Sequence, residues 1–297
     1  MKAKLFFLKL FLSSKRRFTN ARIRLCGAKG REYFINRETK PKIQTYLYYP
    51  QKCDKNKKPL VINVHGGAWV MGDALVLDTQ SQMIADALSA LVVNVNYKKA
   101  DEKPFPYSQY EIFDTVTHSI DRADEYGIDT EKIVLMGYSA GAHLCACCAQ
   151  MLRDKGIKVH TQMLCYPFTD FTCDNGKQVE LQKTLDSIDF LDEVLFAEIE
   201  KGNYLSSPGQ NTDLSGLPFT IIITCTGDSL KVQGDAYAKR LIECGIEVEH
   251  INYEGALHGF MEVNYPETKK DGAKSAEQEI LCKKCLDDIL SIMKNRL

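Results

Sequence analysis

The stretch "KIVLMGYSAGAHL", residues 132–144, joins an apolar strand to a helix through a turn that contains one serine. The run IVLMG is typical of a strand buried on both faces, and the small residues after the serine favour a helix. In this setting the pattern G-x-S-x-G predicts a turn so tight that its flanking residues must be small. The turn exposes Ser139 Oγ beside a helix amino end, which favours negative charge. Ser139 is therefore the candidate nucleophile, with a purely structural turn as the alternative.

Apolar runs of strand length recur on both sides of this stretch and alternate with helical patterns. We expect further strands at residues 43–49, 60–65, 91–96, 158–167, 219–226 and 248–255, and helices at residues 78–89, 111–127 and 273–294. Such alternation implies a mostly parallel sheet with right-handed crossovers. The segment between residues 167 and 219 is longer than a simple crossover needs. We therefore expect a single α/β domain over residues 1–297, with lid elements at about residues 1–35 and 172–206.

A serine nucleophile needs a base, and the chain has six histidines. His258 follows a strand and is flanked by Gly255 and Gly259, which suits a loop base that must reach the serine. In the chain order Ser…Asp…His, the orienting acid falls on Asp228, at the carboxyl end of the strand "TIIITCT". The remaining histidines are interpreted as structural: His65, His118, His143, His160 and His250.

The acid lies within "GDSL", residues 227–230, which is also the signature of another family of serine esterases. That family carries the motif near its amino terminus and a D-x-x-H motif near its carboxyl terminus. Here the motif is late in the chain, and none of the six histidines has an aspartate three residues before it. We therefore interpret Ser229 as the neighbour of the acid and not as a nucleophile.

The motif "HGGAW" follows the strand expected at residues 60–65. Glycines there let backbone N–H groups turn toward a nucleophile and stabilise an oxyanion. We expect the donors to be Gly67, Ala68 and Ala140, with Gly66 supplying the turn and His65 holding the loop by hydrogen bonding. An ordinary β-turn is the alternative.

In their order along the chain, these motifs resemble the hormone-sensitive-lipase-like branch of the α/β-hydrolases, the fold-3 group. The likeness runs from about residue 60 to residue 261 and also includes "NYKKADEKPFP", "CYPFTD" and "LHGF". It implies an α/β-hydrolase fold with helices on both faces of the sheet and a small helical lid. It also implies a serine esterase acting on small, short-chain or acetyl esters, without a metal or a cofactor. Three positions depart from the usual pattern: Ala68 in H-G-G-G, Tyr138 in G-D-S-A-G, and Val232 in D-x-L-x-D.

Two other functions stay open at this point. An amide or formamide hydrolase is one, because "HGGAW" also occurs in formamidase-like enzymes. The other is a non-catalytic ligand-binding protein on the same fold, although such relatives lose the histidine that is present here as His258.

The first residues, "MKAKLFFLKLFLSSKRRF", have an amphipathic pattern in which Leu5, Leu8 and Leu12 share one helical face. The apolar run is too short to span a bilayer, is interrupted by Lys9, and precedes no small-x-small cleavage site. We expect a helix lying over the domain, with membrane-surface contact and export as alternatives. The second lid element is instead rich in acids, which disfavours an anionic membrane surface: Glu180, Asp186, Asp189, Asp192, Glu193, Glu198 and Glu200.

The composition of the chain limits the classes of partner and ligand that we expect. The net charge is −1, so no basic surface suggests nucleic acid. The eleven cysteines have irregular spacings, which favours reduced thiols in a cytoplasmic protein, and a homo-oligomer is compatible with the sequence. The C-x-x-C pairs at residues 145–148 and 282–285 fall on expected helices without further ligands, so we expect no metal site. A solvated loop face is expected for Lys98, Lys99 and Lys103.

Overall fold

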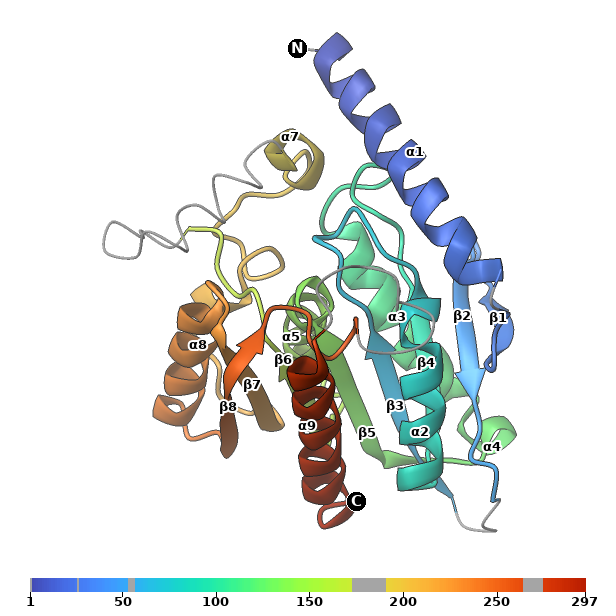
Figure 1. The fold of residues 1–297 in the computed structure, drawn as a ribbon, viewed down its shortest axis with the longest axis vertical. Coiled ribbons are helices and arrows are strands. Elements are labelled where there is room, and N and C mark those ends of the chain that lie inside the picture. Colours follow the sequence, from blue (N-terminus) through green and yellow to red (C-terminus); the bar gives the residue numbers. More distant parts are fainter. Residues whose placement is uncertain (1, 26, 53–56, 173–190, 264–274) are drawn as a thin grey trace.

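The structure is a computed structural model that describes residues 2–25, 27–52, 57–172, 191–263 and 275–297. Its centre is an eight-stranded sheet with the order β1-β2-β4-β3-β5-β6-β7-β8 (Figure 1). Strands β1, β2 and β4 pair antiparallel, and every pair from β4 to β8 is parallel. The strands are β1 (Arg31–Ile35), β2 (Ile43–Tyr48), β3 (Lys58–Val64), β4 (Leu91–Asn96), β5 (Ile128–Tyr138), β6 (Thr161–Cys165), β7 (Phe219–Gly227) and β8 (Val248–Leu257).

Helices cover both faces of the sheet (Figure 1). The pair α2 and α9 covers one face, and α3, α5 and α8 cover the other. The helices are α1 (Lys2–Leu25), α2 (Asp78–Leu88), α3 (Tyr107–Asp121), α4 (Ala123–Tyr126), α5 (Ala140–Asp154), α7 (Asp192–Leu195), α8 (Lys231–Glu243) and α9 (Ala276–Lys294), with 3₁₀ turns η1 (Ala74–Leu77) and η3 (Pro208–Gln210).

The alternation of side chains along the central strands builds two hydrophobic cores. On β3, Leu60 and Ile62 face the layer of α3, α5 and α8, whereas Val61 faces the layer of α2 and α9. All three side chains are fully buried. Because successive side chains of a strand point to opposite faces, a strand covered on both sides must be apolar at nearly every position. This explains the continuous apolar runs that identified the central strands.

The expected α/β-hydrolase architecture is confirmed, with its mostly parallel sheet and helices on both faces. Strand β1 and helix α8 are additional elements that the sequence reading did not name. The amino-terminal helix is present and extends to Leu25. The second lid element lies mostly outside the described residues, including Glu180, Asp186 and Asp189. Its described part, from residue 191, contains α7 and is joined to the loop before α3 by Phe105 N–H, which donates to Leu195 O at 3.0 Å.

The turn from β5 into α5 depends on a close backbone approach. A Cβ atom on Gly141 would lie 2.1 Å from Val64 O and 2.6 Å from His65 O. The first turn of α5 therefore lies directly against the end of β3, and only glycine fits at this position. The same contact brings the "HGGAW" turn beside Ser139.

We expect Gly141→Ala to lower the free energy of unfolding by at least about 3 kcal/mol, because backbone must shift to admit one methyl group. The measurement is urea-induced unfolding of the purified protein. Gly202→Ala is the matched control, because its Cβ atom would meet nothing closer than Thr172 Cγ2 at 3.7 Å. The control is expected to stay within about 1 kcal/mol of the wild type. Equal stabilities of the two variants would contradict the close approach.

Candidate active site

The candidate site lies at the edge of the sheet where the parallel strands end. Ser139 directly follows β5, Asp228 follows β7 and His258 follows β8. Strands β7 and β8 are neighbours, and Gly227 pairs with Leu257 at their ends. The acid and the base therefore leave adjacent strands side by side, as the reading of the sequence expected.

The three side chains form one continuous hydrogen-bonded chain. Ser139 Oγ lies 2.8 Å from His258 Nε2, and His258 Nδ1 lies 2.7 Å from Asp228 Oδ2. The carboxylate can only accept, so Nδ1 carries the proton and Nε2 is free to accept from the serine hydroxyl. The Asp228 side chain is 2% exposed, whereas the His258 side chain is 40% exposed. The arrangement combines a shielded acid with a base that solvent and substrate can reach.

The backbone at Ser139 is held in an uncommon conformation. Its φ is 51° and its ψ is −117°, in the left-handed range that residues other than glycine rarely adopt. Its N–H donates to Cys165 O on β6 at 2.9 Å. This bond anchors the turn to the neighbouring strand, and α5 begins at the next residue. The serine hydroxyl that contacts the base thus belongs to Ser139, while Ser229 occupies the turn before α8.

The "HGGAW" turn lies at the same edge. Its backbone has positive φ at three successive residues, 120° at Gly67, 47° at Ala68 and 60° at Trp69. A Cβ atom on Gly67 would lie 2.4 Å from Met71 O, so this position requires glycine. Ala140 opens α5, where backbone N–H groups have no partner within the helix. A Cβ atom on Gly66 would lie 3.1 Å from Tyr138 O, so the start of this turn lies beside the residue before Ser139. The oxyanion roles of Gly67, Ala68 and Ala140 remain predictions.

Three side chains hold the carbonyl and amide groups at the start of this turn, and Lys99 contacts one of the three. His65 Nδ1 lies 2.6 Å from Gly66 O, and Tyr97 Oη donates to His65 O at 3.2 Å. Gly66 N–H donates to Glu262 Oε1 at 2.7 Å. Lys99 Nζ lies 3.3 Å from His65 Nε2. The contact between His65 and Gly66 agrees with the loop-holding role expected of this histidine.

Lys99 corrects one expectation. The lysines after β4 were expected on a solvated face, and Lys103 is exposed, but Lys99 is buried. Its ammonium donates to Tyr97 O at 2.6 Å and lies 4.0 Å from the centre of the Tyr97 ring. Burial lowers the pKa of Lys99 to about 7. Burial and the nearby Lys99 hold the pKa of His65 well below its usual value, so His65 is neutral and Nδ1 donates to Gly66 O.

Glu262 is a site residue that the sequence reading missed. Its carboxylate is buried between the "HGGAW" turn and Tyr166, and burial raises the pKa of Glu262. Besides Gly66 N–H it accepts from Tyr166 Oη at 3.4 Å, and the Tyr166 ring meets the His258 ring edge-on at 5.0 Å. Glu262 thus connects the "HGGAW" turn to Tyr166, which lies against His258. Its signal in the sequence is an acid within the otherwise apolar run "GFMEV".

His143, one turn beyond Ser139, is structural as expected. Its Nδ1 accepts from Trp69 Nε1 at 3.1 Å, and its Nε2 donates to Ser206 O at 2.8 Å. Burial lowers its pKa to about 4, so the ring is neutral. These bonds tie the "HGGAW" motif, α5 and the end of the second lid element to one another.

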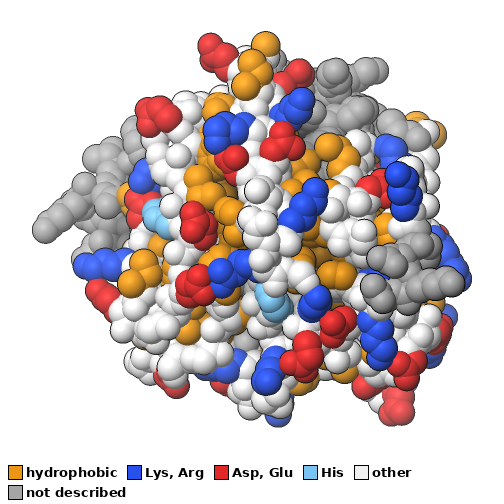
Figure 2. All heavy atoms as spheres, turned by 90° about the horizontal axis from the view of Figure 1, so that it is seen from below, with side chains coloured by type: hydrophobic (Ala, Val, Ile, Leu, Met, Phe, Trp, Pro, Cys, Tyr) orange, Lys and Arg blue, Asp and Glu red, His pale blue; other side chains and the backbone are white. Residues whose placement is uncertain are grey.

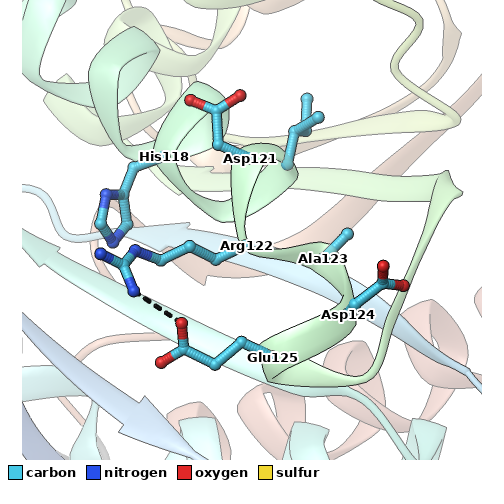
Figure 3. A pocket seen from close by; sticks show the side chains of 7 residues that line it. His118, Asp121, Arg122, Ala123, Asp124 and Glu125 are labelled. Atoms are coloured by element: carbon cyan, nitrogen blue, oxygen red, sulfur yellow. Dashed lines mark hydrogen bonds and ion pairs between the residues drawn. The ribbon is translucent and has the colours of Figure 1, made fainter.

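A separate open pocket lies at the opposite edge of the sheet, before the first residue of β5 (Figure 3). Arg122 pairs with Glu125 at 2.6 Å, while Asp121 and Asp124 point away from this pair. The polar side chains do not converge on one point, so this pocket offers no nucleophile and base in contact. The carboxyl edge of the sheet remains the candidate active site.

Comparisons with known proteins agree with this fold. A family model described as alpha/beta hydrolase fold matches residues 61–262. An arylesterase from Saccharolobus solfataricus is 33% identical over 240 residues, which cover 76% of each chain. Carboxylesterase NlhH from Mycobacterium tuberculosis is 32% identical over 230 residues, covering 74% of this chain and 71% of the relative. The solved structure of an esterase from Pyrobaculum calidifontis has a TM-score of 0.81 at 26% identity, covering 96% of this chain and 92% of that chain.

The buried ammonium group of Lys99, which contacts His65 of the "HGGAW" turn, makes the free energy of unfolding depend on pH. Below about pH 7, Lys99 is charged in both the folded and the unfolded chain, and its burial penalty is fully present. Between about pH 7 and pH 10 it is neutral when folded but protonated when unfolded, so the free energy of unfolding rises with pH. We expect the wild type to gain about 2 kcal/mol over Lys99→Met between about pH 6.5 and about pH 9.

Urea unfolding of both proteins at the two pH values measures this gain. Groups that Lys99 does not influence titrate alike in both proteins and therefore cancel in the difference, whereas His65 and Glu111 face Lys99 and contribute to it. The exposed Lys103→Met is the matched control and should show no such change with pH. A stability difference between the wild type and Lys99→Met that does not vary with pH would contradict the burial of a titrating ammonium.

Proposed function

The chain belongs to the hormone-sensitive-lipase-like family of the α/β-hydrolases, serine carboxylic-ester hydrolases with a Ser-Asp-His triad, and we propose that its triad is Ser139, Asp228 and His258. The observation that carries this proposal is the unbroken hydrogen-bonded chain from Ser139 Oγ through the imidazole to the shielded carboxylate. It supplies nucleophile, base and orienting acid in one line.

The proposed reaction proceeds through an acyl-enzyme. Ser139 Oγ attacks the ester carbonyl carbon while its proton passes to His258 Nε2, and Asp228 stabilises the resulting imidazolium. The N–H groups of Gly67, Ala68 and Ala140 stabilise the negative oxygen of the tetrahedral intermediate. The alcohol leaves with the proton from His258. Water then attacks the acyl-enzyme, again giving its proton to His258, and releases the carboxylic acid.

We propose small esters with short acyl chains, acetyl esters among them, as substrates. Packing beside the oxyanion turn supports this preference. The rings of Trp69 and Phe171 lie 5.0 Å apart, those of Phe168 and Phe171 4.3 Å apart, and those of Phe171 and Phe196 4.8 Å apart. Side chains that fill this space with one another do not form an apolar trough for a long chain.

The lid elements of this proposal are residues 1–35 and 172–206 of one domain. Among the described residues of the second element, Asp192, Glu193, Glu198 and Glu200 are exposed or half-buried. The similarity to an arylesterase and a carboxylesterase, at 33% and 32% identity, favours esters over the amides or formamides considered above, although arylacetamide deacetylase from Oryctolagus cuniculus is also similar, at 26% identity. An assay with a formylated arylamine beside the matching ester separates these activities.

We expect Ser139→Ala to abolish hydrolysis of p-nitrophenyl acetate, with kcat reduced on the order of 10⁶-fold, because the nucleophile is lost. Ser229→Ala is the matched control and should retain most of the activity. Covalent labelling by a fluorophosphonate should disappear in the first variant and persist in the second. Labelling of Ser139→Ala, or equal losses of activity in both variants, would contradict the assignment of Ser139 as the nucleophile.

The acyl preference is measured by kcat/KM for p-nitrophenyl esters from acetyl to palmitoyl. We expect the maximum at short chains and a decline toward palmitoyl, because the packed aromatic side chains leave no trough for the longer chains. A maximum at long chains would show that the aromatic cluster opens to receive them.

A further inference from the structure

Helix α1 has apolar side chains on two opposite faces, and only one of these faces is covered. On the inner face Leu12 and Ile23 are buried, and Leu5 and Leu8 pack against the core. This is the face that the sequence pattern identified. A helix that is apolar on both sides normally has a partner on both sides.

Two arginines fix which face of α1 points outward. Arg16 is buried, and its guanidinium contacts Asp101 at 2.7 Å and Glu102 at 2.7 Å. Arg24 contacts the buried Asp73 at 2.8 Å. Because both arginines are held by carboxylates of the domain, the helix cannot rotate to bury its other face without breaking these ion pairs.

The outward face carries a stripe of large apolar side chains. Phe7 is 66% exposed, Phe11 60% and Phe18 86%, and their spacings of four and seven residues place them on one side of the helix. The outward stripe comprises these residues together with Phe6, Leu10 and Leu25, which are also exposed. A contiguous apolar surface of this kind marks an interaction site.

The charge of α1 identifies the partner. Every charged residue of the helix is basic: Lys2, Lys4, Lys9, Lys15, Arg16, Arg17, Arg22 and Arg24. The whole chain nevertheless has a net charge of −1, so this helix is a basic segment of an otherwise acidic protein. The opposite end of the molecule shows interspersed acidic and basic side chains (Figure 2).

We propose that the outward stripe of α1 docks on an anionic membrane surface. The helix lies in the interface, with its phenylalanines at the boundary between headgroups and acyl chains. Its basic side chains other than the ion-paired Arg16 and Arg24 lie among the lipid phosphates. The contact is peripheral, since no helix within the described residues is long and apolar enough to cross a bilayer. A second copy of the chain fits less well, because two such helices side by side would bring only like charges together.

Docking in this way also orients the enzyme. In Figure 1 the amino-terminal half of α1 extends beyond the sheet on the side where the carboxyl ends of β3 and β5 lie. That is the side of the candidate triad. An apolar ester dissolved in the membrane would then meet the catalytic edge of the sheet and not the opposite end.

The test is co-sedimentation with vesicles of phosphatidylcholine, with and without added phosphatidylglycerol. The test variant is Phe7→Glu/Phe11→Glu. The matched control is Ile242→Glu/Ile280→Glu, which changes two exposed apolar side chains of α8 and α9 and alters the net charge equally. Circular dichroism and thermal unfolding establish that both variants fold. All substituted side chains are exposed, so no core packing is lost.

We expect the wild type and the control to bind the phosphatidylglycerol vesicles, and the test variant to bind at least about tenfold more weakly. Binding should also weaken in high salt and on pure phosphatidylcholine, because the cations lose their counter-charge. Failure of the wild type to bind, or equal binding by the test variant, overturns the proposal. So does a wild-type dimer that the test variant converts to a monomer, since the stripe is then a protein interface. None of these results depends on the triad assignment.

Discussion

The close approach of α5 to the end of β3 at Gly141 is the constraint on which the candidate site depends. Val64 O occupies the position that a Cβ atom of residue 141 would need. Because Gly141 has no Cβ atom, α5 can begin directly after β5 and lie against the end of β3. This contact places the amino end of α5, the proposed nucleophile Ser139 and the "HGGAW" turn within one small region. The left-handed backbone at Ser139 is the strain that accompanies so abrupt a turn. The close packing of backbone at Gly141 therefore also fixes the position of Ser139.

Around this turn, buried polar groups do the positioning. Lys99 sets the tautomer of His65, and His65 in turn holds the carbonyl of Gly66. On the other side, Glu262 holds the amide of Gly66 and contacts Tyr166, whose ring lies against His258. Buried charges are unfavourable unless hydrogen bonds compensate them, and each of these groups has such partners. The oxyanion turn and the base are therefore parts of one connected network.

The sequence was sufficient for the parts of the molecule that local pattern determines. Apolar runs and helical spacing in the sequence predict the strands and the inner apolar face of α1. Neighbouring motif residues predict the order Ser139, Asp228 and His258. Lys99 was misread because its burial depends on Tyr97 and on α1 packing over the loop, neither of which a local charge pattern contains. Glu262 was missed because its partners lie far away in the sequence.

The chain order of the sheet has a consequence for biosynthesis. The proposed nucleophile Ser139 and the "HGGAW" turn come from the first half of the chain, whereas Asp228 follows β7 and His258 follows β8, the edge strand that comes last in the sequence. A nascent chain that ends before β7 therefore contains Ser139 without its proposed acid and base. Because a domain generally folds as a unit during synthesis, the proposed triad can form only after the residues of β8 and His258 have been made.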